Sequence, residues 1–365
     1  MDHLFSFVKR PIRAILSALL ATILTAAMVG GSAQSVSAAS GKYFYWANMN
    51  IGGIGRAATT PPNTVTSQFI KPNDPGAPSY GLASDGVYIY WSELGDSMSF
   101  ISRAPINNPT AVEKEFITVT EDKGSVYSIV ISDKTIFWSA TVDEDEVNGL
   151  IMKAPIDRPN EVEELARGVY ATSLAIDSGQ LYWINLNDEG ESTPFIGRMS
   201  LSDKSDLEKS WFDTGFELVF GLAAKAGYVY WHNIERNSIG RVKASDHSVV
   251  NKEFISDVND DDFYSGLALD AHAIYWTSNR LEDNEDEPEM IGSIKSAELA
   301  KPNVVRTVVD RISPSVPLVI AGGSKPASAP PAKKKQTLRK GATPKWIKKR
   351  GTTVINKRGA TTRQG

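Results

Sequence analysis

The sequence predicts an all-β fold, a six-bladed β-propeller built from four-stranded antiparallel blades. An aromatic residue followed by Trp recurs six times, at Tyr45-Trp46, Tyr90-Trp91, Phe137-Trp138, Tyr182-Trp183, Tyr230-Trp231 and Tyr275-Trp276. The Trp residues are 45, 47, 45, 48 and 45 positions apart, and each interval holds four short strand signals. The 3.6-residue apolar period of helical repeats is absent. A repeat of this length and pattern is typical of propeller blades.

Each aromatic-Trp segment is expected to be the second strand of a blade. A strand rich in small residues precedes it, and a tight turn such as Asp85-Gly86 joins the two. The five predicted inner strands are YGLAS at 80, YSIVI at 127, TSLAI at 172, FGLAA at 220 and SGLAL at 265.

The third and fourth strands of each blade follow the aromatic-Trp segment. The third strands are predicted at IGRA 54, ISRA 101, IMKA 151, IGRM 196, IGRV 239 and IGSIKSA 291. The fourth are predicted at VTSQFI 65, VEKEFI 112, VEELA 162, LEKSWF 207, VNKEFI 250 and VVRTVV 304.

The first unit lacks an inner strand of its own, and the segment SVPLVIA at 315–321 supplies one from the other end of the chain. We therefore expect the C-terminal strand to pair with N-terminal strands and to close the ring, which hides edge strands without a disulfide. The small residues of the inner strands should let neighbouring blades approach closely. The six Trp side chains should fill the spaces between blades.

The repeat resembles the YWTD propeller repeat of low-density-lipoprotein-receptor-like proteins, from Tyr43 to Ala321. The resemblance implies the same six-bladed fold but carries over no receptor ligand. The fourth motif position departs from Asp, with Asn48, Glu93, Ala140, Asn185, Asn233 and Ser278 in its place. The repeated blade-edge network of the family is therefore not carried over to this chain.

Three segments of different composition make up the chain. Residues 1–39 carry Lys9, Arg10 and Arg13 before an apolar run and small residues, the pattern of a signal peptide, although an uncleaved anchor stays an alternative. Residues 40–321 form the predicted propeller, and residues 322–365 a basic, Pro/Ala-led tail that we expect to be disordered. We therefore predict a secreted protein, extracellular or periplasmic.

The net charge of −4 hides a strong separation of charge. The signal segment holds three basic residues and one acidic residue, and the tail holds 13 basic residues and no acidic one. The propeller is left with 39 − 3 − 13 = 23 basic and 43 − 1 = 42 acidic residues, a net charge of −19. Because the chain has no Cys, disulfides, thiolate metal sites and Cys nucleophiles are excluded.

Acidic clusters fall in loops after second and fourth strands, which share one face of a propeller. A cation site there, with Ca²⁺ as the candidate cofactor, would use Asp143, Asp145, Asp188, Asp260, Asp261, Asp262, Asp283 and Asp286. A solvated rim without a ligand is the alternative that we favour, because none of these loops has the spacing of a known calcium loop.

Four aromatic residues near the starts of inner strands should stand by the central channel on the same face: Tyr80, Tyr127, Phe220 and Tyr264. They are candidates for binding a protein or carbohydrate ligand, and core packing is the alternative. His232 is a further candidate near the acidic loops, although a single His forms no three-His metal site and no Gly-x-Ser-x-Gly motif accompanies it. We assign no catalytic residue.

The tail offers a second candidate site. Its basic residues surround Trp346 and suit an anionic surface, through Lys333, Lys334, Lys335, Trp346, Lys348, Lys349 and Arg350. The alternatives are a solvated extension without a partner, or a tail that folds back onto the acidic face. Nucleic acid is the least favoured partner of a secreted chain.

Taken together, the sequence favours a monomeric, secreted binding or scaffold propeller over an enzyme. It would have an acidic ligand face and a basic tail for surface attachment. The alternative is a metal-dependent hydrolase or lactonase of the propeller type, whose metal ligands would gather around the channel. This chain instead places small and apolar residues there.

Overall fold

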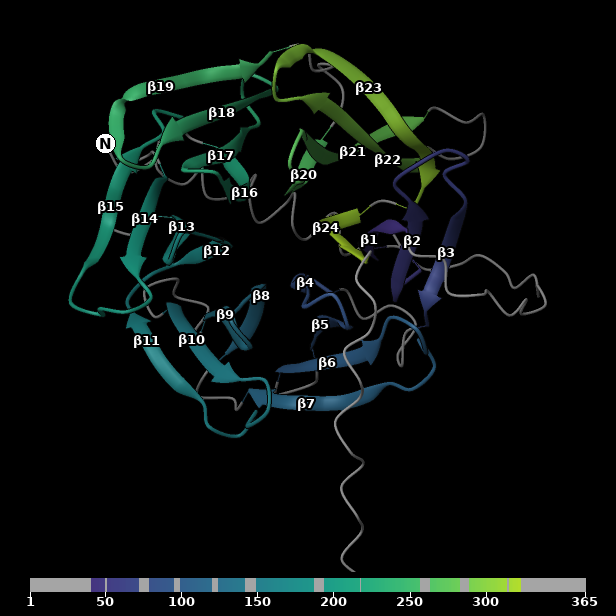
Figure 1. The fold of residues 1–365 in the computed structure, drawn as a ribbon, viewed down its shortest axis with the longest axis horizontal. Coiled ribbons are helices and arrows are strands. Elements are labelled where there is room, and N and C mark those ends of the chain that lie inside the picture. The colour runs from purple at the N-terminus through teal and green to yellow at the C-terminus, as the bar shows by residue number, and fades with distance from the viewer. Residues whose placement is uncertain are drawn as a thin grey trace, which may run out of the picture. The chain divides into compact units, whose positions relative to one another are not determined.

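The chain forms six four-stranded antiparallel sheets arranged in a ring, as seen in a computed structural model (Figure 1). The structure describes residues 41–49, 51–71, 79–94, 99–119, 124–141, 149–186, 194–216, 218–256, 263–282, 289–313 and 315–322. Within these residues 24 strands occur, which confirms the predicted six-bladed propeller. Among the same residues, no helix is long and apolar enough to cross a membrane.

The strands occupy the four predicted positions of each blade. The inner strands are β24 (Ser315–Gly322), β4 (Leu82–Ser84), β8 (Ser125–Ser132), β12 (Ala171–Asp177), β16 (Val219–Lys225) and β20 (Phe263–Leu269). The second strands are β1 (Lys42–Asn48), β5 (Tyr88–Leu94), β9 (Thr135–Thr141), β13 (Gln180–Asn185), β17 (Tyr228–Asn233) and β21 (Ala273–Glu282).

The outer half of each blade follows in the same order. The third strands are β2 (Ile54–Ala58), β6 (Ser99–Pro105), β10 (Gly149–Pro155), β14 (Phe195–Ser200), β18 (Ser238–Lys243) and β22 (Glu289–Glu298). The fourth strands are β3 (Val65–Ile70), β7 (Glu113–Val119), β11 (Glu163–Arg167), β15 (Leu207–Asp213), β19 (Asp246–Ile255) and β23 (Lys301–Ile312). β19 and β23 are longer than predicted.

The ring closes as the sequence predicts, because β24 completes the blade of β1, β2 and β3. β24 pairs antiparallel with β1 in a register that places Leu318 opposite Trp46 and Ile320 opposite Phe44. The first blade therefore takes its inner strand from the C-terminal end of the propeller, and this pairing holds the two ends of the ring together.

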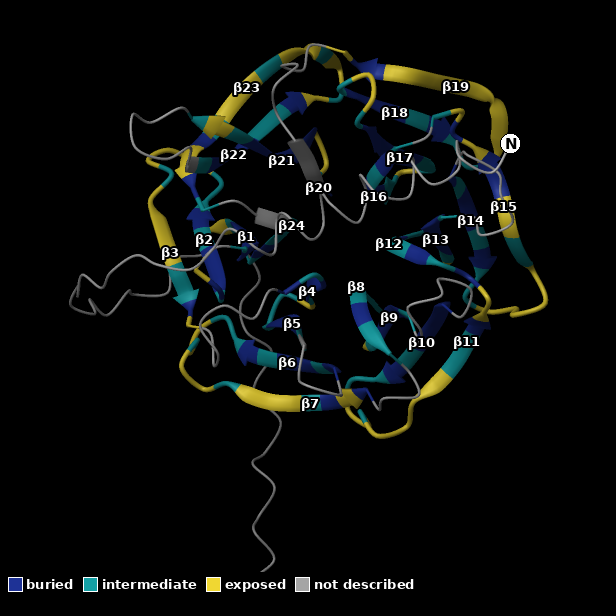
Figure 2. Ribbon diagram, turned by 180° about the vertical axis from the view of Figure 1, so that it is seen from behind, coloured by how far each residue is buried: buried dark blue, intermediate teal, exposed yellow. Residues whose placement is uncertain are grey.

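The six Trp side chains of the motif lie between blades, and none of them is more than 4% exposed. Six apolar clusters join successive blades, and each contains one of these Trp residues. Trp183, for example, packs with Leu174 and Leu181 of its own blade and with Ile151 of the blade before. Burial is deepest in the second and third strands, whereas the fourth strands carry most of the exposed residues (Figure 2).

The Gly of the recurring Ile-Gly-Arg segment is the cross-strand partner of the Trp. Trp183 lies opposite Gly197, and a Cβ on this Gly would lie 2.2 Å from Trp183 Cε2. The indole ring therefore covers the glycine backbone directly, which leaves no room for a side chain. The same stacking occurs at the pairs Trp46 with Gly55 and Trp231 with Gly240.

The Arg of the equivalent third-strand segment, Ile-Gly-Arg or Ile-Ser-Arg, lies between two aromatic rings in three blades. In the first blade, Arg56 Cζ lies 4.5 Å from the ring centroid of Tyr43 and 3.9 Å from that of Phe69. A cation–π contact at an exposed site is worth about 0.5–1 kcal/mol, so these contacts fix the three outer strands to one another. The equivalent triplets are Arg103 with Tyr88 and Phe116, and Arg241 with Tyr228 and Phe254.

Small residues of the inner strands form the contacts between blades near the axis, as predicted. A Cβ on Gly81 would lie 2.6 Å from Ile129 Cγ1 in the next blade. Where the small residue is Ser, its hydroxyl accepts a hydrogen bond from the next blade instead. Ser128 Oγ accepts from the Leu174 backbone N–H at 3.0 Å, and Ser173 Oγ accepts from Leu222 N–H at 3.0 Å.

The fourth motif position retains a hydrogen-bonding role in several blades although its Asp is missing. Trp46 Nε1 donates to Asn48 Oδ1 at 2.9 Å, and Trp91 Nε1 donates to Glu93 Oε1 at 2.6 Å. Asn48 Nδ2 also donates to the Ser67 carbonyl at 2.7 Å, next to a register shift between β2 and β3. Asn therefore ties the second strand to the fourth in the first blade.

Candidate functional site

The face that carries the connections after second and fourth strands is called the loop face here; residues 51–53, 168–170 and 234–237 belong to it. The predicted cation residues Asp143, Asp145, Asp188, Asp260, Asp261, Asp262, Asp283 and Asp286 lie outside the described residues. The tail residues Lys333, Lys334, Lys335, Trp346, Lys348, Lys349 and Arg350 lie outside them too. Both sets stay predictions.

Two of the four predicted aromatic residues form a pair between neighbouring blades. The ring centroids of Tyr80 and Tyr127 lie 5.8 Å apart, with an angle of 34° between the ring planes. Both residues are half-buried. Burial, and then the nearby Tyr127 hydroxyl, raises the pKa of Tyr80, so this phenol is protonated at neutral pH. The pair presents two aromatic rings and two hydroxyl groups.

Local backbone structure positions each ring of the pair. Ser92 Oγ accepts hydrogen bonds from the backbone N–H groups of Tyr80 at 3.1 Å and Gly81 at 2.8 Å, which fixes the entry into β4. Tyr127 lies at the register shift between Val126 and Ser128 in β8. Such a bulge redirects a side chain from the regular alternation of the strand.

The other two aromatic residues do not join this pair in the described part of the chain. Phe220 is half-buried in β16, where its backbone pairs with His232. Tyr264 lies in β20 opposite Ser278, and its side chain is outside the described part. His232, in the fifth blade, is only 1% exposed, so its side chain does not line an exposed surface.

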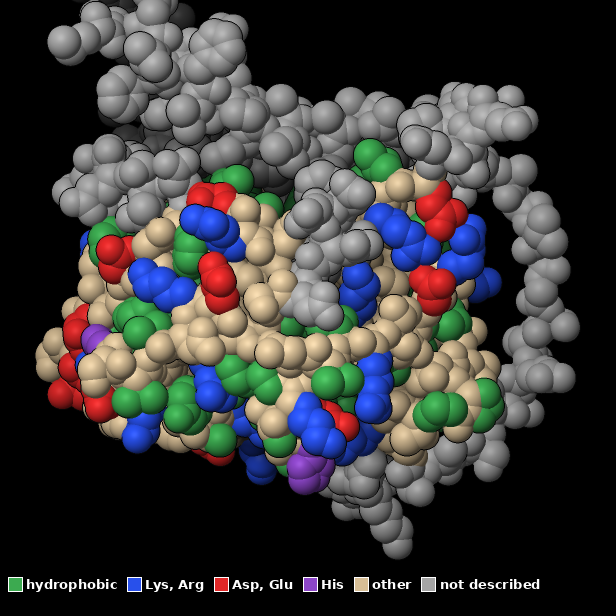
Figure 3. All heavy atoms as spheres, turned by 90° about the horizontal axis from the view of Figure 1, so that it is seen from above, with side chains coloured by type: hydrophobic (Ala, Val, Ile, Leu, Met, Phe, Trp, Pro, Cys, Tyr) green, Lys and Arg blue, Asp and Glu red, His purple; other side chains and the backbone are tan. Residues whose placement is uncertain are grey.

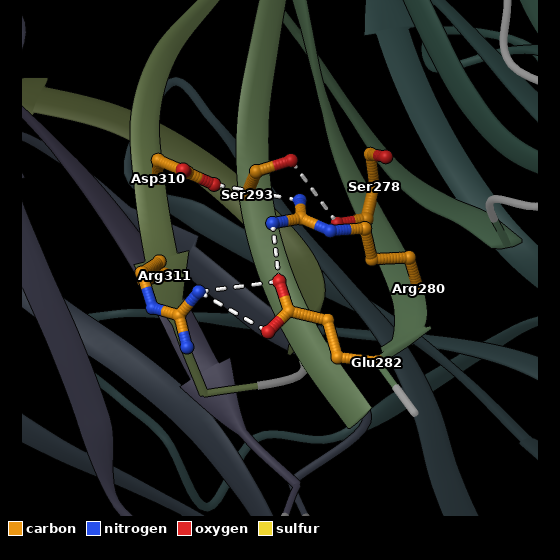
Figure 4. A network of polar contacts seen from close by, with 6 residues as sticks. All are labelled: Ser278, Arg280, Glu282, Ser293, Asp310 and Arg311. Carbon is orange, nitrogen blue, oxygen red and sulfur yellow. Dashed lines mark hydrogen bonds and ion pairs between the residues drawn. The ribbon is translucent and has the colours of Figure 1, made fainter. Parts of the chain in front are cut away.

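A charged network on the loop face was not predicted from the sequence (Figure 4). Arg280 donates to Glu282 Oε1 at 2.9 Å and to Asp310 Oδ1 at 3.4 Å, and Arg311 donates to Glu282 Oε2 at 3.1 Å. The hydrogen bond from Arg280, with Arg311 nearby, lowers the pKa of Glu282. Leu281 between them is 56% exposed.

This network exists because the strands of the sixth blade are long. β21 and β22 pair from Ala273 opposite Glu298 to Glu282 opposite Glu289, and β23 runs alongside. No sequence signal indicated the extra length, because Thr277 to Glu282 show no regular alternation of polar and apolar residues. Figure 3 views the ring from the side of β19 and β23 and shows acidic, basic and hydrophobic side chains interspersed.

Among the described residues, no cluster of three or more His, Asp or Glu side chains could hold a metal ion. The predicted Ca²⁺ site therefore rests on the acidic loops outside the described residues.

Comparison with known proteins identifies the fold. A scan against protein-family models finds no match, and a search of curated proteins finds none either. A solved structure of a nidogen/laminin complex is similar, with a TM-score of 0.56 and 18% identity over 78% of this chain and 100% of that chain. A protein from Lactobacillus plantarum has a TM-score of 0.43 and 11% identity over 77% and 99% of the two chains.

TolB from Acinetobacter baumannii has a TM-score of 0.47 and 12% identity over 73% of this chain and 65% of that chain. At such identities a structural likeness shows the fold alone, because one fold hosts many functions. The likeness to the nidogen/laminin structure therefore supports the β-propeller fold and carries over no function.

Proposed function

We propose that this protein is a secreted or periplasmic binding or scaffold module whose loop face holds a protein or carbohydrate ligand. The observation that carries the proposal is the pair of Tyr80 and Tyr127, half-buried rings 5.8 Å apart from two neighbouring blades. Aromatic rings with polar tips bury a large area at a low entropic cost and hydrogen-bond at the same time. A ligand that bridges two blades would use both properties.

The similar solved structure is a complex of nidogen and laminin, and from that likeness we infer that partner binding suits this fold. The ring also gives the Tyr pair a rigid support. Ser92 holds the backbone of Tyr80, and the next blade contacts Gly81. A rigid support lowers the cost of ordering a binding site.

The test is a screen of the purified protein on glycan and peptide arrays. A variant with Tyr80→Ala and Tyr127→Ala should bind its ligand at least about tenfold more weakly, because interface aromatic residues contribute about 2 kcal/mol or more. Tyr228→Ala is the matched control, since Tyr228 is half-buried and has a ring neighbour, Tyr230, at 6.4 Å. Equal binding by the double variant, or no ligand in either class, contradicts the proposal.

We further propose that the tail attaches the protein to anionic surfaces, because residues 322–365 carry 13 basic and no acidic residues. Its test is retention on anionic vesicles by the mature protein and by a chain that ends at Gly323. Equal retention of the two contradicts attachment through the tail. Melting with millimolar Ca²⁺ and with chelator tests the acidic loops, because a bound cation must raise the melting temperature (Tm).

A further inference from the structure

Three blades have Asn two residues after the motif Trp, at Asn48, Asn185 and Asn233, and the side chains of Asn48 and Asn233 differ in their partners. In the first blade Asn48 accepts from Trp46 Nε1 and donates to the carbonyls of Ser67, Gly53 and Gly52 at 2.7, 3.2 and 3.3 Å. Both atoms of the Asn48 amide are therefore satisfied within the protein.

In the fifth blade Asn233 is 0% exposed, and neither atom of its amide has a hydrogen-bond partner among the described residues. The same holds for Trp231 Nε1 and for Ser238 Oγ, on side chains that are 0% and 1% exposed. Ser238 is the cross-strand partner of Asn233, and Trp231 lies two residues before it. Because side chains alternate along a strand, the three lie on one face of the sheet.

The loop explains why Asn233 lacks the bonds of Asn48. Gly52 and Gly53 both adopt left-handed backbone angles, with φ of 65° and 72°, and their carbonyls reach the Asn48 amide. In the fifth blade Ser238 takes the place of Gly53 and has no positive φ. The turn is closed instead by a hydrogen bond from Asn237 N–H to the Ile234 carbonyl at 3.2 Å. Asn237, in the place of Gly52, keeps a positive φ of 44°, but neither loop carbonyl bonds the Asn233 amide as the Gly52 and Gly53 carbonyls bond Asn48.

Leaving a buried polar group unpaired costs about 1–3 kcal/mol, so this cluster requires a ligand. It offers donors from Trp231 Nε1 and Asn233 Nδ2, an acceptor at Asn233 Oδ1, and a Ser238 hydroxyl that does either. None of these groups is charged, so an ion bound there would be buried without an opposite charge, and the cluster favours a neutral ligand. Complete burial also excludes a large molecule. Water donates and accepts in this pattern, and buried waters make about three hydrogen bonds each.

We propose that Trp231, Asn233 and Ser238 form a buried water-binding site. Trp231 packs against Val219 and against Phe212 of the preceding blade, so the site lies at the interface of the fourth and fifth blades. The bound water takes the place of the Gly52 and Gly53 carbonyls of the first blade. It also holds the loop that carries Glu235, whose Oε1 accepts from Leu218 N–H at 3.0 Å.

The experiment is water ¹⁷O relaxation dispersion on the full chain and on Asn233→Leu, which removes the polar centre of the site at similar volume. The amplitude from long-lived buried waters should fall by about one molecule in this variant. Asn48→Leu is the matched control and should cause no such fall, because Asn48 binds protein groups only. An unchanged amplitude in a folded Asn233→Leu overturns the proposal.

A crystal structure of the unmodified protein keeps the proposal falsifiable if the variant does not fold. Ordered water should lie within about 2.7–3.2 Å of at least two of the three side chains. Direct hydrogen bonds from Asn233 to Trp231 or to a fourth-strand carbonyl, without such a water, would overturn it. The binding of a ligand on the loop face affects neither outcome.

Discussion

Gly197→Ala should destabilise the propeller through a single steric contact. A Cβ at Gly197 would lie 2.2 Å from Trp183 Cε2 and 2.4 Å from its Cζ2 and Nε1. The backbone of Gly197 is outside the left-handed region, so Ala adds no backbone strain. The whole effect must come from the indole ring, which is 0% exposed in the cluster between the third and fourth blades.

The magnitude follows from how far the ring must move. Real Cβ contacts are not closer than 3.0 Å, so the ring must shift by at least 3.0 − 2.2 = 0.8 Å. Overpacking of this kind lowers the free energy of unfolding by about 1–3 kcal/mol. Because the indole ring is completely enclosed, we expect a loss of about 2 kcal/mol or more. At about 2–4 °C per kcal/mol, Tm should fall by about 4–8 °C.

Thermal and urea unfolding followed by far-UV circular dichroism would measure this change. Gly41→Ala is the matched control, because the nearest atom to its Cβ, Tyr43 Cε2, is at an ordinary 3.9 Å. The control should stay within about 0.5 kcal/mol of the unmodified protein. If Gly197→Ala melts within about 1 °C of the control, the stacking of Trp on Gly does not stabilise the blades as argued.

Three further predictions concern other contacts. Asn48→Ala should cost about 1–3 kcal/mol in the free energy of unfolding, because it leaves the buried Trp46 Nε1 and the Ser67 carbonyl unpaired; an unchanged urea midpoint would contradict this. Burial raises the pKa of Tyr45 from 10.0 to about 12. The unfolded chain therefore loses this proton first, and stability should fall from pH 10 to pH 12 by up to about 1.4 kcal/mol per pH unit. Tyr45→Phe should make the stability-against-pH curve shallower there, and identical slopes would refute the assignment. Arg311→Ala should change Tm by less than about 2 °C, because its ion pair with Glu282 is exposed, and a larger loss would show that the network stabilises the sixth blade.

The repeat of the chain made the fold predictable. Each Trp fixed the position of a second strand, and the strand count revealed that SVPLVIA must return to the first blade. The partners of the Ile-Gly-Arg segment were not identified, because they depend on the cross-strand register of Trp46 with Gly55 and of Tyr45 with Arg56. The aromatic-Trp motif therefore located each blade in the sequence but did not show which residues its side chains contact.

The candidate site was predictable only in part. The starts of inner strands converge in any propeller, which is why Tyr80 and Tyr127 could be expected near each other. The charged network of the sixth blade could not be predicted, because each β-bulge shifts the pairing of all residues that follow it in the strand. This network brings Arg280 and Glu282 close to Arg311, about 30 residues later in the sequence. Three register shifts between β22 and β23 decide which residues of these strands lie side by side.

Closure of the ring by β24 is the central structural claim, and removal of that strand tests it most directly. Thermal unfolding should be compared between a chain that ends at Gly323 and one that ends at Ser313, before β24. The longer chain should melt like the full protein, whereas the shorter one should lose most of its Tm or fail to fold, because Phe44 and Trp46 lose Leu318 and Ile320. An equal Tm for the two chains would contradict the closed ring.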